Sequence, residues 1–233
     1  MYQLMHGDCL DLLCEIPDQS VDMICCDLPY GTTQNKWDSV IPLVPLWMQY
    51  ERICKGTIVL TAAQPFTSAL VASKFDEFRY SWVWEKEPTG NLNAKRMPMS
   101  AHEDILVFGR GTYNPQGLKP TLRKRSASDN SRTANYGEQK RTPYEQTVTG
   151  YPSTILSFRK DSEKLHPTQK PVALMEYLVR TYTNEYDVVL DNCMGSGTTG
   201  VACAQSNRLF IGMERDDKYF EIARNRIEAA YGT

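Results

Sequence analysis

Four consecutive residues, Asp27-Leu28-Pro29-Tyr30, bring together a carboxylate, backbone carbonyls and an aromatic ring. An exocyclic amino group on a nucleobase is a poor nucleophile, because its lone pair is delocalised into the ring. A carboxylate and a carbonyl that accept its two N–H groups would localise that lone pair, and an aromatic face could hold the base for in-line attack. The tetrapeptide therefore carries the groups that methylation of such an amine requires, with Asp27, Pro29 and Tyr30 as candidate catalytic residues.

The place of this tetrapeptide in the chain favours a ligand-binding role. It follows the apolar run 21–26, which is typical of a strand buried in a parallel sheet. Ligands of open α/β sheets bind at the carboxyl ends of such strands. A base inside a duplex is inaccessible, so the target would have to be flipped out. The alternative interpretation is a Pro-Tyr turn that only closes a strand.

A second segment has the character of a nucleoside-binding turn. Asp191 ends an expected strand, and Gly195-Ser196-Gly197-Thr198-Thr199 opens an expected helix. Glycines let a ligand approach the main chain, and a helix N-terminus offers free N–H groups to a carboxylate or phosphate. Glu214 follows Gly197 by 17 residues, at the end of the next strand. An acid at that place would accept the hydroxyls of a ribose.

Three ligands compete for this turn. A phosphate-binding NTPase loop needs a lysine after the last glycine, and Thr198 stands there instead. Gly195, Gly197 and Gly200 match the spacing of a dinucleotide loop, which is a weak pattern on its own. S-adenosylmethionine carries a ribose without a pyrophosphate and needs only the tight turn and the acid. A glycine turn required for packing remains as the alternative without a ligand.

Alternating strand and helix patterns must position these segments. Strand patterns cover residues 2–5, 21–26, 57–61, 80–84, 104–108, 187–191 and 208–213, and helix patterns cover 9–16, 45–53, 66–75, 171–182, 198–204 and 216–230. This alternation predicts a Rossmann-like, doubly wound α/β fold, with a mostly parallel sheet and helices on both faces. The length of 233 residues suits one such domain with an insert.

Residues 109–164 interrupt the periodic pattern, and polar and basic residues dominate them. Between Arg110 and Lys160 ten basic residues stand against three acidic ones, although the formal net charge of the chain is −2. Such a local excess is typical of proteins that bind polyanions. We therefore expect a catalytic half over 1–108, a basic insert over 109–164 and a second, cofactor-binding half of the same domain over 165–233.

The motifs and their order resemble those of the β-class DNA amino-methyltransferases, which modify adenine N6 or cytosine N4. Residues 27–30 resemble the catalytic Asp-Pro-Pro-Tyr, residues 191–199 resemble the cofactor-binding Asp-Pro-Phe-x-Gly-Ser-Gly-Thr-Thr, and Glu214 resembles the ribose-binding acid. His6-Gly7-Asp8 is similar to the motif that contacts the cofactor's adenine edge. His166-Pro167-Thr168-Gln169-Lys170-Pro171 is similar to the segment that helps to hold its methionine part. The catalytic motif precedes the cofactor motif, and this circularly permuted order marks the class.

The resemblance implies S-adenosylmethionine as cofactor and assigns residues to it. The implied cofactor-binding residues are Asp8, Asp27, His166, Thr168, Lys170, Asp191, Cys193, Gly195, Ser196, Gly197, Thr198, Thr199 and Glu214. Two positions depart from the family pattern. Leu28 replaces the first proline of the catalytic motif, and Cys193 replaces a phenylalanine that packs near the cofactor. We expect the chemistry to be preserved and cofactor affinity to be reduced.

The resemblance also implies double-stranded DNA as the substrate and the insert as the target-recognition region. The implied DNA-binding residues are Lys86, Arg123, Lys124, Arg125, Lys140 and Arg141, with Tyr136, Tyr144 and Tyr151 as candidates for stacking. A solvated surface loop is the alternative for each. The family further suggests a homodimer and a cognate restriction endonuclease as partners.

Adenine N6 is the expected target, because the leading Asp27 resembles the adenine-specific members, whereas cytosine-specific members more often have serine. Cytosine N4 is the alternative target. Methylation of RNA or of a protein glutamine is disfavoured by Asp27, since those relatives carry Asn-Pro-Pro-Tyr. A degenerate DNA-binding module without turnover is the alternative from another class, and only Leu28 and Cys193 favour it.

Composition restricts the remaining possibilities. Hydrophobic residues make up 41% and charged residues 23% of the chain, as in an ordinary globular protein. No secretory or membrane segment is evident, so a cytoplasmic, prokaryotic or phage-encoded protein is expected. Seven cysteines without a Cys-x-x-Cys pair indicate buried free thiols. With three scattered histidines, no metal site is expected.

Overall fold

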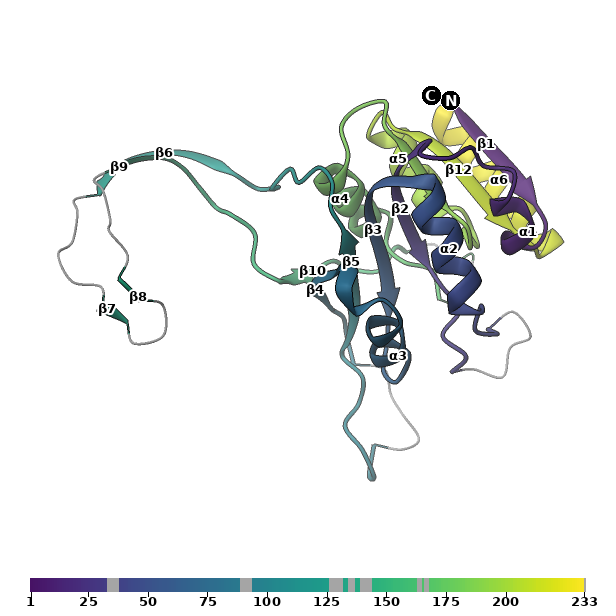
Figure 1. Ribbon diagram of the computed structural model, residues 1–233, viewed down its shortest axis with the longest axis horizontal. Coiled ribbons are helices and arrows are strands. Elements are labelled where there is room, and N and C mark those ends of the chain that lie inside the picture. The colour runs from purple at the N-terminus through teal and green to yellow at the C-terminus, as the bar shows by residue number, and fades with distance from the viewer. Residues whose placement is uncertain are drawn as a thin grey trace. The chain divides into compact units, whose positions relative to one another are not determined.

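An eight-stranded sheet forms the centre of the larger of two units in the computed structural model (Figure 1). The structure describes residues 1–32, 38–88, 94–125, 132–133, 137–138, 144–162, 165 and 168–232. The larger unit comprises Met1–Asn114 and Thr154–Thr233, and the smaller comprises Pro115–Ser153. In spatial order the strands of the sheet are β1 (Tyr2–His6), β12 (Leu209–Glu214), β11 (Val188–Asp191), β2 (Val21–Asp27), β3 (Cys54–Ala62), β5 (His102–Gly109), β4 (Phe78–Glu85) and β10 (Ile155–Ser157).

The sheet is mostly parallel, which confirms the predicted fold class. β5 alone among these described strands runs antiparallel to its neighbours, β3 and β4. The parallel register pairs His6 with Glu214, Leu190 with Ile24 and Asp27 with Thr61. The strand ends that carry the motifs therefore meet at one edge of the sheet.

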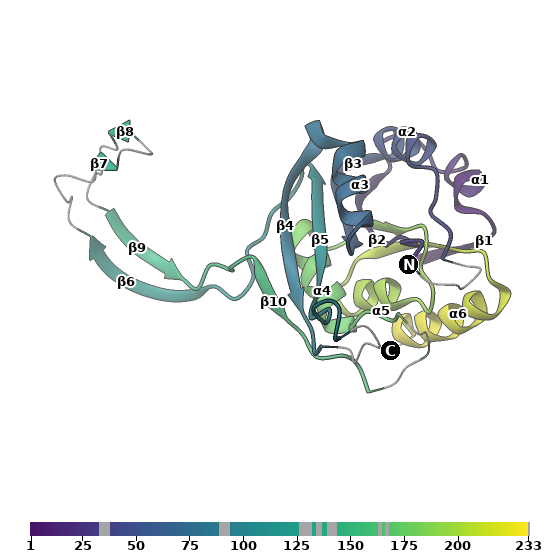
Figure 2. The same cartoon turned by 90° about the horizontal axis from the view of Figure 1, so that it is seen from below.

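Helices cover both faces of the sheet, as Figure 2 shows. One layer contains α1 (Cys9–Leu13), α2 (Leu43–Ile53) and α3 (Phe66–Ser73), and a 3₁₀ turn over Phe75–Glu77 follows α3. The other layer contains α4 (Val172–Tyr182), α5 (Thr198–Gln205) and α6 (Asp217–Tyr231). Each layer packs its apolar side chains into its own buried cluster.

Strand β2 contributes to both clusters, which explains its nearly continuous apolar sequence after Asp22. Ile24 and Cys26 pack with the layer of α1 to α3, whereas Met23 and Cys25 pack with the layer of α4 to α6. Successive side chains of a strand point to opposite faces, and here each face is covered by helices. Asp27 follows this run directly, and its carboxylate lies at the sheet edge where the motif-bearing strand ends meet.

Trp82 and Trp84 on β4 are 3% and 1% exposed and belong to the core. The cysteines follow the expectation of buried free thiols only in part. All seven cysteines are free thiols, and Cys25, Cys26 and Cys203 are buried, but Cys14 is exposed. Cys14 lies at the C-terminal end of the short helix α1, whose outer side faces solvent, so the expectation of burial is wrong for this cysteine.

The smaller unit contains regular structure where the sequence shows no periodicity. β6 (Lys119–Arg125) and β9 (Tyr144–Thr149) pair as antiparallel strands, and β7 (Arg132–Thr133) pairs with β8 (Gly137–Glu138). A two-stranded ribbon without a helix layer has no continuously buried face, so its residues need not alternate between apolar and polar. The expected insert, 109–164, is also longer than this unit, because β10 joins the sheet beside β4.

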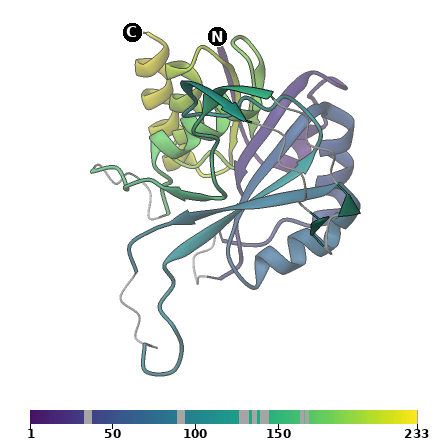
Figure 3. The same ribbon diagram turned by 90° about the vertical axis from the view of Figure 1, so that its left-hand side faces the viewer.

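The two ends of the described chain lie close together in the larger unit (Figure 3). The Tyr2 and Tyr231 rings are 5.0 Å apart between centroids.

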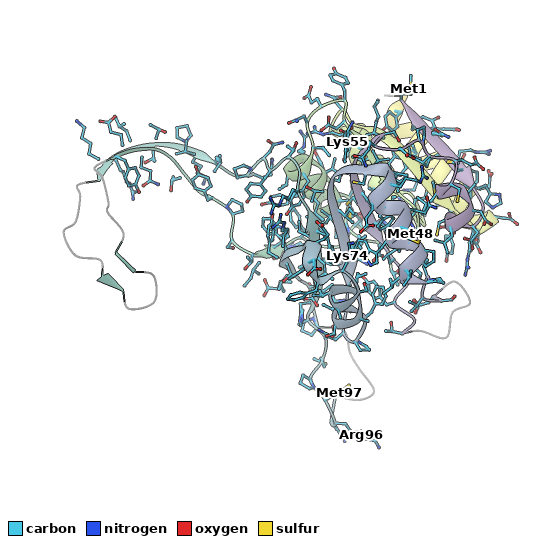
Figure 4. All side chains as sticks on the ribbon, viewed as in Figure 1. Met1, Met48, Lys55, Lys74, Arg96 and Met97 are labelled. Atoms are coloured by element: carbon cyan, nitrogen blue, oxygen red, sulfur yellow. The ribbon has the colours of Figure 1, made fainter. Side chains whose placement is uncertain are left out.

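The loop between β4 and β5 carries Arg96 away from the sheet (Figure 4). None of the helices in the described ranges is both long and apolar enough to cross a membrane.

Candidate active site

The candidate site lies where neighbouring helices leave the sheet on opposite faces. α5 follows β11 into one helix layer, and α2 follows β2 into the other. This reversal between adjacent parallel strands is the place where ligands bind in doubly wound folds. A cavity of about 1160 Å³ opens there, lined by the strand-end segments of β1, β2, β11 and β12. It is large enough for a nucleoside-sized ligand together with a second molecule.

The glycine turn after β11 is organised around Glu214. Its Oε2 accepts a hydrogen bond of 3.0 Å from the backbone N–H of Gly195, and its Oε1 accepts 2.9 Å bonds from Arg215 and Asp216. Burial raises the pKa of Glu214, and these three N–H groups act in the opposite direction. The carboxylate is thus fixed against the turn and borders the cavity, with acceptor sites beyond those three bonds.

Asp191 holds the same turn from inside. Its Oδ2 accepts a 2.6 Å bond from the Thr199 hydroxyl, and its Oδ1 accepts a 3.1 Å bond from the backbone N–H of Cys193. Burial raises the pKa of Asp191 to about 6, although both bonds favour the ionised form. Asp191 therefore shapes the loop that borders the cavity.

Gly197 has a packing role. Its φ is +80°, and a Cβ built there would lie 3.0 Å from Cα of Ala223 on α6. A left-handed conformation and a close backbone neighbour both require glycine. Gly197 does not line the cavity, whereas Gly195 does. The packing of the fold therefore requires Gly197, which the sequence analysis assigned to the cofactor.

The first turn of the chain joins the same edge. Gly7 donates its backbone N–H to the Glu214 carbonyl at 3.0 Å. Asp8 is the N-cap of α1, and its Oδ1 accepts a 2.9 Å bond from the Leu10 N–H. Both Gly7 and Asp8 line the cavity next to Glu214.

The catalytic tetrapeptide forms a tightly bonded turn at the end of β2. The Tyr30 hydroxyl donates to Asp27 Oδ1 at 2.8 Å, and Thr61 on β3 donates to the same oxygen. The Tyr30 ring stacks on Phe66, with 5.5 Å between centroids. Burial and the neighbouring Asp27 carboxylate raise the pKa of Tyr30 well above its ordinary value. Tyr30 is therefore a neutral hydroxyl donor that orients Asp27.

Asp38 fixes the chain immediately after this turn. Its two carboxylate oxygens accept hydrogen bonds from the backbone N–H groups of Gly31 at 2.8 Å and Thr32 at 2.9 Å. Gly31 has φ of +68°, a left-handed conformation that glycine adopts without strain. The turn is thus held at both ends, by Asp27 contacts and by Asp38.

Lys170 approaches Asp27 from the segment that precedes α4. Its Nζ lies 2.6 Å from Asp27 Oδ2 and 3.2 Å from Glu103 Oε2, and Glu103 also pairs with Lys86 at 2.5 Å. The expected DNA contact Lys86 is therefore largely buried in an ion pair at the cavity. The resemblance assigned Lys170 to the cofactor, and the structure places its ammonium group on Asp27.

Three thiols meet at the base of the cavity. Cys193 interacts with both Cys26 and Cys9. The contact with Cys26 and burial raise the pKa of Cys193 well above its ordinary value, whereas the contact with Cys9 acts in the opposite direction. Asn192 Nδ2 also lies 3.6 Å from Cys193 Sγ. Cys193, which replaces the family's phenylalanine, therefore belongs to a neutral, close-packed group of sulfur atoms.

Most of the predicted site residues come together around this cavity. Those that line it are Asp8, Asp27, Pro29, Tyr30, Lys86, Thr168, Lys170, Asp191, Cys193, Gly195, Ser196, Thr198, Thr199 and Glu214. Arg123, Lys124 and Arg125 lie on β6 of the smaller unit. His166, Lys140, Arg141 and Tyr136 lie outside the residues that the structure describes.

Three residues of the site were not predicted: Thr61, Asp38 and Glu103. Glu103 had a readable signal. It stands at the start of an apolar strand, and the start of an antiparallel strand lies at the same sheet edge as the ends of its parallel neighbours. A prediction that β5 is antiparallel would have placed Glu103 at the site.

Comparisons with known proteins agree with this geometry. A family model described as DNA methylase, of the N6/N4 methyltransferase type, matches residues 21–225. "DNA adenine methyltransferase YhdJ" of Escherichia coli (strain K12) is 29% identical over 97% of this chain and 83% of its own length. "Type II methyltransferase M.HpaI" of Haemophilus parainfluenzae is 26% identical over 98% of this chain and 75% of its own. The crystal structure of the M1.HpyAVI–SAM complex superposes with a TM-score of 0.67 at 25% identity, over 97% of this chain and 100% of that one.

Proposed function

The chain belongs to the DNA methylase family of N6/N4 methyltransferases, and from this premise we propose that it transfers a methyl group from S-adenosylmethionine to the N6 amino group of adenine in double-stranded DNA. The observation that carries the proposal is the single cavity that joins the nucleoside turn at Glu214 to the carboxylate of Asp27. The relatives named above include an adenine methyltransferase and a type II methyltransferase.

The donor set of the cavity fits the cofactor. S-adenosylmethionine has a ribose diol and two positively charged groups, and the cavity presents the carboxylates of Glu214, Asp8 and Asp27 along its wall. Glu214 is half-buried and anchored by three N–H groups, so its remaining acceptor sites lie in a fixed place for hydroxyl groups. Gly195, with φ of +52°, presents bare backbone beside it.

The residues after β2 would activate the amine. S-adenosylmethionine supplies a methyl group bound to a positively charged sulfur. Asp27 and a backbone carbonyl of Leu28 or Pro29 accept the two amino N–H groups, which localises the nitrogen lone pair toward that methyl group. As the N–C bond forms and the C–S bond breaks, the nitrogen loses one proton, for which Asp27 is the acceptor and solvent the final destination.

The departure at position 28 does not disturb this arrangement. The Leu28 side chain is buried in the cluster beneath α1 to α3, and only its backbone carbonyl needs to serve the substrate. Asp27, Pro29 and Tyr30 are present as in the family pattern. We therefore favour an active enzyme over a degenerate binding module.

The smaller unit is proposed to bind DNA. Arg123 and Lys124 on β6 are exposed, and Lys124 makes only a long ion pair of 3.7 Å with Glu145. Tyr144 and Tyr151 are exposed aromatic side chains in the same unit. Cations that are not neutralised within the protein can bind phosphates, and exposed aromatic rings can stack on bases.

Further partners follow from the relatives. The name of the Haemophilus parainfluenzae relative marks it as a type II methyltransferase, so a cognate restriction endonuclease is included in the proposal, as is a homodimer. A DNA substrate further implies action in the cytoplasm of a prokaryotic cell.

The test is direct methylation of unmethylated genomic DNA. The purified protein is incubated with DNA and S-adenosylmethionine, and the DNA is digested to nucleosides for mass spectrometry. N6-methyladenine is the expected product. N4-methylcytosine would refute adenine as the target, and absence of both from a sample that binds the cofactor would refute the DNA-methylating activity.

A matched pair of variants links the product to the site. Asp27→Ala should bind cofactor and DNA but lose most of its turnover, on the order of a hundredfold or more, because the amine loses its acceptor. Asp76→Ala, which removes an exposed carboxylate just after α3, should retain wild-type activity. Near-normal methylation by the Asp27 variant would remove Asp27 from the mechanism.

A further inference from the structure

Lys170 lies between two carboxylates at the floor of the cavity. Its side chain is 6% exposed, and its Nζ is 2.6 Å from Asp27 Oδ2 and 3.2 Å from Glu103 Oε2. An ammonium group withdrawn from water needs such partners to compensate its lost hydration. Burial alone would lower the pKa of Lys170, but the two carboxylates outweigh it and raise the pKa. Lys170 is therefore a charged donor with no capacity to accept a proton.

Lys170 belongs to a row of alternating charges that continues through Glu103 to Lys86. Glu103 Oε1 pairs with Lys86 Nζ at 2.5 Å, and both of these side chains are largely buried. The row Lys86, Glu103, Lys170 and Asp27 is formally neutral. Removal of one member leaves its neighbours with an uncompensated charge, so the row fixes the position of Lys170.

The acceptor sites of Asp27 show what this contact leaves for a substrate. An ionised carboxylate offers about four acceptor sites. In the described part of the chain, Oδ1 accepts bonds from Tyr30 and Thr61, and Oδ2 accepts one from Lys170. One site on Oδ2 remains, and the Asp27 side chain is 25% exposed beside the cavity.

We infer that Lys170 and Glu103 are positioning residues, which hold the Asp27 carboxylate in place and direct its one remaining acceptor site to the amino group of the target base. The inference rests on the proposed function and adds to it. It assigns Lys170 to Asp27 instead of to the methionine part of the cofactor. Glu103 acts one step further away, by holding the Lys170 ammonium group charged and in place.

The test compares the pH dependence of kcat in four variants. In Lys170→Met the two carboxylates lose the cation that lies between them, and only Glu103 keeps a partner, in Lys86, so one carboxylate takes up a proton at higher pH. We expect the acidic limb of the kcat profile to move up by about one pH unit or more, and kcat at pH 7 to fall about tenfold or more. Lys170→Gln gives the same comparison if the methionine variant does not fold.

Two further variants separate charge from packing. Lys170→Arg keeps the cation, and its acidic limb should return to within about half a pH unit of wild type. Glu103→Gln keeps Lys170 beside Asp27, so its limb should not move upward, although kcat should fall about three- to tenfold because Lys170 loses its anchor. An acidic limb that stays unmoved in both Lys170→Met and Lys170→Gln would overturn the inference.

Cofactor affinity and carboxyl titration provide readouts other than turnover. By calorimetry, S-adenosylmethionine should bind Lys170→Met no more than about threefold more weakly than wild type. A larger loss of affinity with an unmoved limb would assign Lys170 to the cofactor and overturn the inference. Carbon-13 NMR of aspartate and glutamate carboxyl groups, without cofactor or DNA, should show the same upward shift for the carboxylate pair.

The wild-type protein in the same assay distinguishes the two proposals. If it produces no methylated nucleoside, the proposed function fails. If it methylates DNA while the variants titrate as wild type does, only the role of Lys170 and Glu103 fails.

Discussion

The Tyr50 hydroxyl on α2 donates a 2.6 Å hydrogen bond to Asn192 Oδ1, in the turn that follows β11. Both residues are buried, and they stand 142 positions apart in the chain. The bond ties α2, which follows β2, to the glycine turn that follows β11. The two halves of the site are therefore connected by a specific polar contact as well as by the sheet.

Tyr50→Phe should destabilise the protein by about 1–3 kcal/mol, because the Asn192 amide is left buried without this donor. Urea denaturation measures the change in the free energy of unfolding. Tyr186→Phe, at a 72% exposed position, should leave that free energy unchanged. Equal stability of the two variants would show that the Tyr50 bond contributes nothing.

Glu214→Gln should weaken cofactor binding by about tenfold or more, since the side chain loses its charge and half of its acceptor sites while three N–H groups compete for the rest. At saturating cofactor, kcat should stay within a few-fold of wild type. Calorimetry gives the affinity, and Glu15→Gln on the exposed surface is the control. Unchanged affinity would refute the ribose-binding role.

The raised pKa of Asp191 should appear in the pH dependence of stability. Asp191 titrates near pH 6 when folded and near its ordinary value of 3.8 when unfolded, so between these values the folded state binds more protons. Its contribution is then greatest below pH 4 and falls as the pH rises to 6, by up to roughly 3 kcal/mol. Asp191→Asn should remove this part of the profile, as thermal unfolding between pH 4 and 7 would measure. An identical pH dependence in the variant would contradict the assignment.

Arg123→Ala combined with Lys124→Ala should weaken DNA binding at low salt and reduce the slope of log K against log salt by about 2, since each lost phosphate contact contributes about 0.9. Fluorescence anisotropy with a labelled duplex at several salt concentrations measures the slope. Arg224→Ala removes a half-exposed cation on α6 of the larger unit, as a control. A slope equal to that of wild type would exclude these two residues from phosphate contact.

The sheet and the strand-end motifs were predictable because they depend on local patterns. The run 21–26 is apolar on both faces and ends at Asp27, and the run before Asp191 feeds directly into glycines. These are short-range signals, and the parallel register brings the strand ends together without further information. The fold class and most of the cavity lining followed from them.

The ion pairs around Lys170 could not be predicted in the same way. Its contacts with Asp27 and Glu103 join residues 143 and 67 positions apart, and they depend on β5 being antiparallel. The ribbon of β6 and β9 was missed for a different reason, since exposed paired strands require no hydrophobic alternation. The packing role of Gly197 could not be recognised from the sequence, because a left-handed turn beside α6 and a ligand-binding turn need the same residue type.

β1 pairs with β12, and the Tyr2 ring lies beside the Tyr231 ring, so the first and last elements of the chain are neighbours in space. The order of the elements along the sequence therefore differs from their order in the structure. A gene rearrangement that joined these neighbouring ends and opened the chain elsewhere would keep the same strand contacts. The segment that carries Asp27 and the segment that carries Glu214 would then be translated in the opposite order. The two segments can thus be exchanged in evolution because the first strand and the last helix lie within a few ångströms of each other.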